Sequence, residues 1–300
     1  MNKIKILVSI VIISFYSCSD SVDSATEVSP KTKLDKSPIA EYEIIPNPIK
    51  DAYFGDLHVH TENSFDAYTF GTTATPEDAY RYAQGEAISH PSGYKIQLSR
   101  PLDFYAVTDH GIFLGLMKEA ADTTTEVSKY EFVKPLHNLN ENVNGGIFEL
   151  LRRSNLFRPI GQALADGIED GTVDTKLLDR VSQSAWQKTI SAADQAYLPG
   201  VFTTFAGYEY TSSVELYDNY LHRNVIFRDT KNLPKRLFTR GDSLNPEDLW
   251  DWMDRLRSKG VESLAIPHNT NLSGGAAFAM TYYNGNPIDE LYTKQRSINE

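Results

Sequence analysis

Short apolar runs that end in histidine or acidic residues recur along this chain and restrict the folds that it can adopt. The run over residues 52–60 ends in His58 and His60. The run over 102–108 is followed almost directly by His110. Short runs of this kind, bounded by turn-forming residues, are typical of buried strands. We therefore expect strands that carry polar side chains to one edge of a sheet, which is where parallel α/β folds build their sites.

Helix signals alternate with these runs. Thr75-Pro76-Glu77-Asp78 supplies an N-cap, a proline at the first helical position and acids near the helix N-terminus, so a helix is predicted from Thr75 to about Gln84. Similar patterns predict the remaining elements, which are helices over 182–197 and 245–260 and strands over 201–208, 225–228 and 263–266. The alternation indicates a parallel sheet or barrel with five recognisable strands, interrupted over about 118–180 by a partly helical insertion.

The N-terminus has the pattern of an export signal. Lys3 and Lys5 precede an apolar run over 6–15, and Cys18 is the only cysteine of the chain. The segment around Cys18 resembles a bacterial lipoprotein signal, which implies cleavage before the cysteine and a lipid on its thiol; an ordinary secretory signal with an incidental cysteine is the alternative. We expect a signal peptide over 1–17, a flexible tether over 18–50 and a folded domain over 51–300. The expected location is the bacterial cell envelope, as a periplasmic protein or an outer-membrane lipoprotein, with membrane contact only through the lipid anchor.

The charge balance argues against nucleic acid as a partner. The chain has 29 basic and 40 acidic residues, a net charge of -11, which repels phosphate backbones as a whole. A small anionic substrate is still compatible with this charge, because bound divalent cations can reverse the local sign of an acidic pocket.

Histidines at predicted strand ends indicate a metal site. Of the 7 histidines, the five at strand ends are His58, His60, His110, His222 and His268. In His58-Val59-His60 the strand period of two points both imidazoles to the same side, where one metal could bind both; a hydrogen-bonded pair in a core or on a surface is the alternative. The two other histidines, His90 and His137, lie in polar stretches and are expected to be solvated.

The chain contains two longer motifs, in the order Asp56-Leu57-His58-Val59-His60-Thr61 and Thr108-Asp109-His110-Gly111. Together they resemble the polymerase and histidinol phosphatase (PHP) superfamily of trinuclear metal phosphoesterases, most closely a branch of secreted PHP-like proteins. Gly207-Tyr208-Glu209 is similar to the third motif of that family, and His222 and His268 match its next two ligands. Asp66 occupies a ligand position at which the family frequently has histidine. The resemblance covers about Ala52 to Leu272 and implies a distorted TIM-like (β/α)7 barrel.

The resemblance also implies how the ligands are shared among two or three Zn, Mn or Fe ions, all of which accept imidazole and carboxylate ligands. The implied sets are His58, His60 and Glu209 for a first metal, Glu209, His222 and His268 for a second, and Asp66 and His110 for a third. Asp109 is expected to orient a neighbouring imidazole, with metal ligation or a loop cap as alternatives. Tyr208, Arg223 and Asn269 flank ligands and could contact an anionic oxygen or serve in packing. The candidate catalytic residues are therefore Glu209, His110, Asp109 and Arg223.

The family pattern ends in an Asp-x-His pair that supplies further ligands, and no such pair follows His268. We therefore expect an N-terminal fragment of a longer protein, whose barrel and metal shell are completed beyond Glu300.

The function implied is hydrolysis of a phosphoester by a metal-bound hydroxide at a di- or trinuclear site. The chain has no Gly-x-Ser-x-Gly elbow, P-loop or dinucleotide fingerprint, which also favours hydrolysis at a metal. Two alternatives stay open. One is an amidohydrolase-type enzyme, against which Thr108-Asp109-His110 argues, and the other is a surface lipoprotein that binds metal or ligand without turnover.

Overall fold

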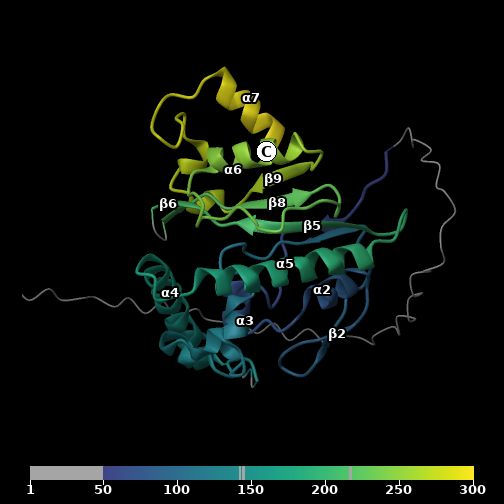
Figure 1. Ribbon diagram of the computed structural model, residues 1–300. Coiled ribbons are helices and arrows are strands. Elements are labelled where there is room, and N and C mark those ends of the chain that lie inside the picture. The colour runs from purple at the N-terminus through teal and green to yellow at the C-terminus, as the bar shows by residue number, and fades with distance from the viewer. Residues whose placement is uncertain (1–49, 142, 144–145, 216–217) are drawn as a thin grey trace, which may run out of the picture. The chain divides into compact units, whose positions relative to one another are not determined.

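Residues 50–141, 143, 146–215 and 218–300 are described by the structure, which is a computed structural model (Figure 1). The described residues all belong to one unit, Ser37–Glu300. The predicted signal peptide, Cys18 and the tether up to residue 49 lie outside them. Within the described part of the chain, every helix is too short or too polar to cross a membrane.

The fold is of the mixed α/β class and is built on one five-stranded sheet (Figure 1). Its strands, in spatial order, are β1 (Gly55–Asp56), β4 (Phe104–Val107), β5 (Thr203–Tyr210), β8 (Arg223–Phe227) and β9 (Ser263–Pro267). The first three are parallel, whereas β8 runs antiparallel to both of its neighbours. The prediction of five strands is thus confirmed, but the prediction of an all-parallel sheet is wrong.

The reversal of β8 keeps the polar strand ends together. Arg223 at the start of β8 lies opposite Tyr210 at the end of β5 and Pro267 at the end of β9. His222 therefore precedes its strand yet lies at the same sheet edge as residues that follow theirs. The backbone N–H of His268 donates to the carbonyl of His222 over 3.2 Å, which joins the two segments.

The first strand is shorter than the predicted run over 52–60. After Asp56 the chain leaves the regular ladder, because the N–H of Val59 donates to the Thr108 hydroxyl (2.9 Å) instead of to a neighbouring carbonyl. The N–H of Thr108 in turn donates to the carbonyl of Val59 (2.7 Å). The segment with His58 and His60 consequently stays beside β4 without being a strand.

Helices α2 (Pro76–Ala83), α5 (Thr175–Ala196), α6 (Pro246–Arg257) and α7 (Glu290–Asn299) pack around the sheet. A capping box between Thr75 and Asp78 begins α2, as predicted, and the Asn245 side chain accepts from the N–H of Glu247 at the start of α6. Helix α5 begins earlier than predicted and lies alongside both α2 and β5 (Figure 1).

The core beneath the sheet edge combines aromatic and aliphatic side chains. Trp186 of α5 packs against Phe227 and Tyr208, with Leu249 and Met253 of α6 in the same cluster. Because neighbouring side chains of a strand alternate between its faces, burial of Tyr208 in this cluster directs Glu209 to the other face.

The insertion predicted over about 118–180 contains helix α4 (Ile147–Glu169), two 3-10 turns, η1 (Val127–Lys129) and η2 (Glu131–Leu136), and the end of α3 (Leu116–Ala121). The smaller elements elsewhere are α1 (Phe65–Thr69), the hairpins β2 (Ile88–Ser89) with β3 (Lys95–Ile96) and β6 (Ser213–Glu215) with β7 (Asp218–Tyr220), and the turns η3 (Thr270–Leu272) and η4 (Ala276–Phe278). Arg153 of α4 is buried and donates to the carbonyls of Thr69 (2.8 Å) and Leu139 (2.9 Å), which ties α4 to α1.

Candidate metal centre

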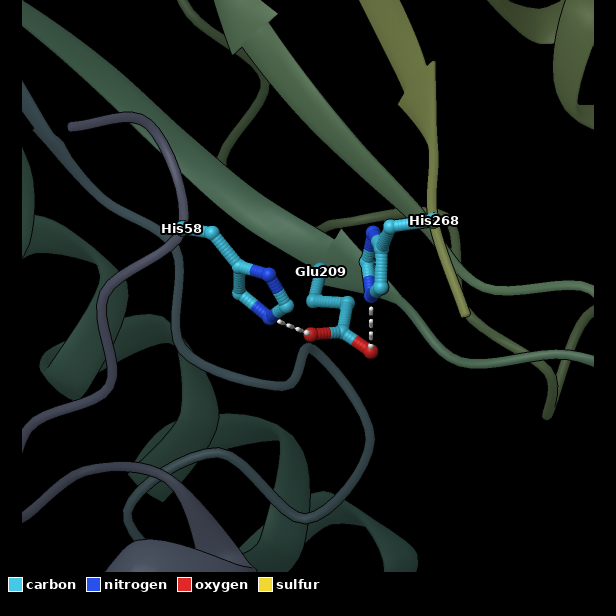
Figure 2. Close-up of side chains that lie close together, drawn as sticks. All are labelled: His58, Glu209 and His268. Carbon is cyan, nitrogen blue, oxygen red and sulfur yellow. Dashed lines mark ion pairs between the residues drawn. The ribbon is translucent and has the colours of Figure 1, made fainter. Parts of the chain in front are cut away.

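One buried carboxylate, that of Glu209 near the end of β5, forms the centre of the histidine cluster. An oxygen of Glu209 lies within 3.3 Å of a ring nitrogen of each strand-end histidine: 3.3 Å for His58, 3.0 Å for His60, 3.3 Å for His110, 2.7 Å for His222 and 3.2 Å for His268. Figure 2 shows His58 and His268 each directed at a different oxygen of this carboxylate. The structure thus brings together all five histidines that the sequence singled out.

The segments that carry these side chains are held by backbone hydrogen bonds at the sheet edge. After β4, the chain continues beside β5, where the N–H of Gly111 donates to the carbonyl of Glu209 (2.9 Å). This pairing continues the parallel ladder past the end of β4 and fixes His110 next to Glu209. His222 and His268 are joined in the same way across β8 and β9.

Asp66, near the start of α1, connects two of the histidines. Its two oxygens lie 3.3 Å from Nδ1 of His60 and 3.3 Å from Nε2 of His110. The hydroxyl of Ser64 donates to the Asp66 carboxylate (2.6 Å) and lies 2.9 Å from His60 Nδ1. The sequence analysis missed Ser64, which is the N-cap residue of α1. Serine is common at this position, so the start of a helix next to Asp66 was the signal that could have identified it.

The ligand atoms form two triads that share Glu209. One consists of His58, Glu209 and His268, and the other of His60, His110 and Glu209, with the three candidate ligand atoms of each within 4.8 Å of one another. The rings follow the same division, with centroids 4.2 Å apart for His58 and His268 and 4.7 Å apart for His60 and His110. These triads divide four of the histidines differently from the expected sets, which placed His58 with His60 and left His110 to a third metal. The expected group of Glu209, His222 and His268 also meets, at Oε1 of Glu209.

Several atoms of the cluster are buried without a hydrogen bond among the described residues. They are Oε1 of Glu209, Nδ1 of His222 and Nε2 of His268. The two nitrogens lie 2.7 and 3.2 Å from Oε1, but the angles are not those of hydrogen bonds. A buried polar atom without a partner is costly, whereas a cation among these atoms would satisfy all three at once. The donor set therefore fits a divalent metal such as Zn, Mn or Fe.

The charges of the cluster are strongly coupled. Burial would raise the pKa of Glu209, but the imidazoles, with His110 first, outweigh burial and hold this pKa well below its usual range. Burial likewise would raise the pKa of Asp66, and His110 and His60 lower it. Burial would lower the pKa of His60, yet hydrogen bonds with Asp66 and Glu209 raise it to about 10. Burial lowers the pKa of His222, which favours the neutral imidazole that metals bind.

Asp109 supports the loop rather than an imidazole. Its buried carboxylate accepts from the backbone N–H of Thr61 (2.5 Å) and from the Thr61 hydroxyl (2.7 Å). Burial raises the pKa of Asp109 to about 6, with the Thr61 hydrogen bonds acting in the opposite direction. These contacts are those of a loop cap, which was one of the alternatives for Asp109. A hydrogen bond from Asp109 to an imidazole, which was expected, is not among them. Asp109 thereby fixes the segment immediately after His60.

Two of the flanking residues serve in packing and backbone hydrogen bonds, which was the stated alternative to contact with an anionic oxygen. Arg223 is buried, forms an ion pair with Glu300 and donates to the carbonyl of Leu221 (2.5 Å), so its guanidinium is committed to structure and is not among the residues that line the cavity of the cluster. The Tyr208 hydroxyl donates to the carbonyl of Phe238 (2.8 Å), on the core side of the sheet. Asn269 does line the cavity of the cluster and adopts a left-handed conformation, with φ of 53°.

The remaining histidines lie outside the cluster, as expected, but both are half-buried rather than solvated. The ring of His90 stacks on Tyr94, with centroids 4.3 Å apart. Nε2 of His137 lies 3.1 Å from the carbonyl of Ser128.

A cavity of about 490 Å³ opens beside the cluster. Its lining includes residues that the sequence analysis did not identify, among them Phe157 and Gly161 of α4, Thr211, Tyr220 and Arg240. The hydroxyl oxygen of Thr211 also lies 2.5 Å from Nδ1 of His110. No local pattern connects these residues with the histidine motifs, because they come from segments that meet only in the folded chain.

Comparison with known protein families shows to which family the chain belongs. Residues 47–300 match the family described as "Protein of unknown function (DUF3604)", and the chain belongs to this family. The comparison with curated proteins gave no match, and neither did the comparison with solved structures.

Proposed function

We propose that this member of the DUF3604 family is a metal-dependent hydrolase that acts on phosphoesters. The observation that carries the proposal is the buried Glu209 carboxylate, surrounded by five imidazoles and with one oxygen left without a hydrogen bond. Such an arrangement is poorly explained as packing, because two of these imidazoles also have a buried nitrogen without a partner.

The two triads would hold two cations that share the Glu209 carboxylate, and Asp66, which lies beside His110, would offer a ligand for a third. When bound, clustered divalent cations lower the pKa of a coordinated water toward about 7 and stabilise charge that develops on phosphoryl oxygens. The residues of the chain itself hold this geometry. Asp109 fixes the backbone after His60, and Ser64 orients Asp66, so the ligands need little rearrangement on binding.

The contact between Asp66 and His110 supports a phosphoesterase over an amidohydrolase-type enzyme. Its distance of 3.3 Å makes both residues part of the cluster, and the amidohydrolase alternative does not use such a pair. A bridging residue does not separate the two classes, because an amidohydrolase site generally has a lysine or a glutamate between two metals and Glu209 belongs to both triads.

The finer fold assignment belongs to the same proposal. The five-stranded sheet with its ligands at one edge would form one side of a distorted TIM-like barrel of the PHP type. We also propose that the protein is exported and anchored through a lipid on Cys18. Mass spectrometry of the membrane-bound protein tests this proposal. A diacylglyceryl adduct on Cys18 is expected, and a protein released intact by a Cys18→Ser substitution supports the anchor.

The enzymatic proposal is tested with purified protein loaded separately with Zn, Mn and Fe and supplied with a panel of phosphomonoesters and phosphodiesters. We expect hydrolysis that Glu209→Gln abolishes, because the substitution removes the carboxylate shared by both triads. His137→Ala is the matched control, since His137 lies outside the cluster, and it should leave the rate unchanged. Metal bound at full stoichiometry without hydrolysis of any ester would refute the proposal and leave a binding protein.

A further inference from the structure

The cavity beside the metal ligands has an aromatic wall. Phe65 and Phe157 are stacked, with ring centroids 5.1 Å apart and planes 12° from parallel. Phe65 also lies against His110 (4.9 Å) and Phe113 (6.3 Å). All three phenylalanines line the cavity and none is fully buried, so their rings are accessible from the cavity.

This wall is contributed in part by the insertion. Phe157 lies on α4, whose Gly161 and Ala165 line the same cavity one and two turns further along the helix. The candidate metal ligands lie at the sheet edge, so α4 adds apolar lining that the ligand cluster lacks, next to Arg158 and Gln162 of the same helix. A cavity of about 490 Å³ is in the range of small-molecule sites and holds one ring together with an ionic group.

A cationic side chain lines the same cavity. Arg240 is half-buried, and among the described residues its guanidinium forms no hydrogen bond or ion pair. This contrasts with Arg236 nearby, which pairs with Asp242 and Asp179. In a chain with a net charge of -11, an arginine that faces a metal cavity without a carboxylate partner is suited to bind an anionic group of a ligand.

We propose that this cavity is a subsite for aryl esters of phosphate, in which Phe157 packs against the ring of the leaving group and Arg240 holds the phosphoryl group at the metal ligands. The inference rests on the proposed function, because it names the class of phosphoester that the cluster would hydrolyse. Offset or stacked packing against the Phe157 ring favours a planar aromatic group over an alkyl chain. A phosphomonoester is favoured over a polymeric phosphodiester because the cavity volume accommodates a single small molecule.

Binding of two inert probes tests the proposal independently of turnover. Phenylphosphonate and methylphosphonate carry the same ionic group and differ in the ring, and neither has a P–O ester bond to hydrolyse. Their affinities for the full-length, metal-loaded protein are measured by titration calorimetry. The variants are Phe157→Ala and Arg240→Gln. Phe148→Ala is the matched control on the same helix, because Phe148 is 84% exposed and outside the cavity, and Arg255→Gln is the control for loss of a positive charge.

We expect the unmodified protein to bind phenylphosphonate more tightly than methylphosphonate. Phe157→Ala should weaken the binding of phenylphosphonate by about 10-fold and change the binding of methylphosphonate by less than about 2-fold. Arg240→Gln should weaken both probes by about 10-fold or more, and the two control variants should change neither. Each variant must retain its metal content, which is measured in the same samples.

The outcomes separate the subsite from the reaction. Equal binding of the two probes, or an equal effect of Phe157→Ala on both, would overturn the subsite even if the protein hydrolyses phosphoesters. Selective, Phe157-dependent binding of phenylphosphonate without hydrolysis of any ester would support the subsite and refute the proposed reaction. Failure of both probes to bind the metal-loaded protein would overturn the subsite.

Discussion

Replacement of Arg153 by methionine is expected to destabilise the protein markedly, because this buried guanidinium joins α4 to α1. Arg153 is 2% exposed and donates to the carbonyls of Thr69 (2.8 Å) and Leu139 (2.9 Å) and to Oδ1 of Asn140 (2.7 Å). It also forms an ion pair with Glu149 (2.7 Å). Methionine fills a similar volume, so the loss is confined to the polar contacts.

The magnitude follows from the groups left without a partner. Two buried carbonyls lose a charged donor, and each unsatisfied group costs about 1–3 kcal/mol. Together with the broken ion pair, the free energy of unfolding should fall by about 3–5 kcal/mol. In a domain of this size one kcal/mol corresponds to about 2–4 °C, so the melting temperature should fall by about 6–20 °C.

The assay is thermal unfolding followed by circular dichroism, with Arg152→Met as the matched control. Arg152 is the neighbouring residue on α4, pairs with the same Glu149 and is exposed, so its loss should cost less than about 1 kcal/mol. If Arg153→Met melts within about 2 °C of Arg152→Met, the account of α4 as a helix anchored by this buried charge is refuted.

Two further predictions concern the candidate metal cluster. Gly111→Ala should weaken metal binding, because a Cβ at this position would lie 2.7 Å from Cδ2 of Tyr208 and displace the segment that carries His110; Gly146→Ala, whose Cβ would meet nothing within 4 Å, should bind metal normally in the same titration. Metal binding near pH 7.5 should release a proton from His60, whose pKa is raised to about 10 by Asp66 and Glu209 against the effect of burial, so affinity should increase with pH toward that value. Calorimetry in two buffers of different ionisation enthalpy measures this release, and identical heats in both would contradict it.

Much of the candidate metal site was predictable from sequence because its determinants are local. The five histidines follow or precede short apolar runs, and each run became a strand or stayed next to one. The starts of α2 and α6 were predicted for the same reason, since the caps at Thr75 and Asn245 involve residues within three positions of the helix start.

The direction of β8 could not be predicted, because an apolar run has the same alternation in either direction. The expectation of a parallel strand came from the preceding helical segments, but the connection into β8 is only the short hairpin region after β5. His222 nevertheless reaches the cluster, since the start of an antiparallel strand lies at the same edge as the ends of its neighbours.

The role of the insertion and the position of Arg223 depend on contacts between distant segments. Arg153 contacts residues up to 84 positions away, and Arg223 pairs with Glu300, which is 77 positions away. Arg223 is adjacent in sequence to the candidate ligand His222, which suggested that it contacts an anion. In the folded chain its guanidinium faces the carboxylate of Glu300 instead. The division of the histidines into two triads also depends on geometry, because spacing alone places His58 with His60.

The proposed hydrolysis requires cations at Glu209, and anomalous diffraction from crystals soaked separately with Zn and Mn locates them. We predict one cation within about 2.0–2.3 Å of Glu209, His58 and His268 and a second at the same range from Glu209, His60 and His110. Saturating metal with no anomalous peak at either triad, or with peaks only at surface carboxylates, would show that Glu209 is not the centre of a metal site.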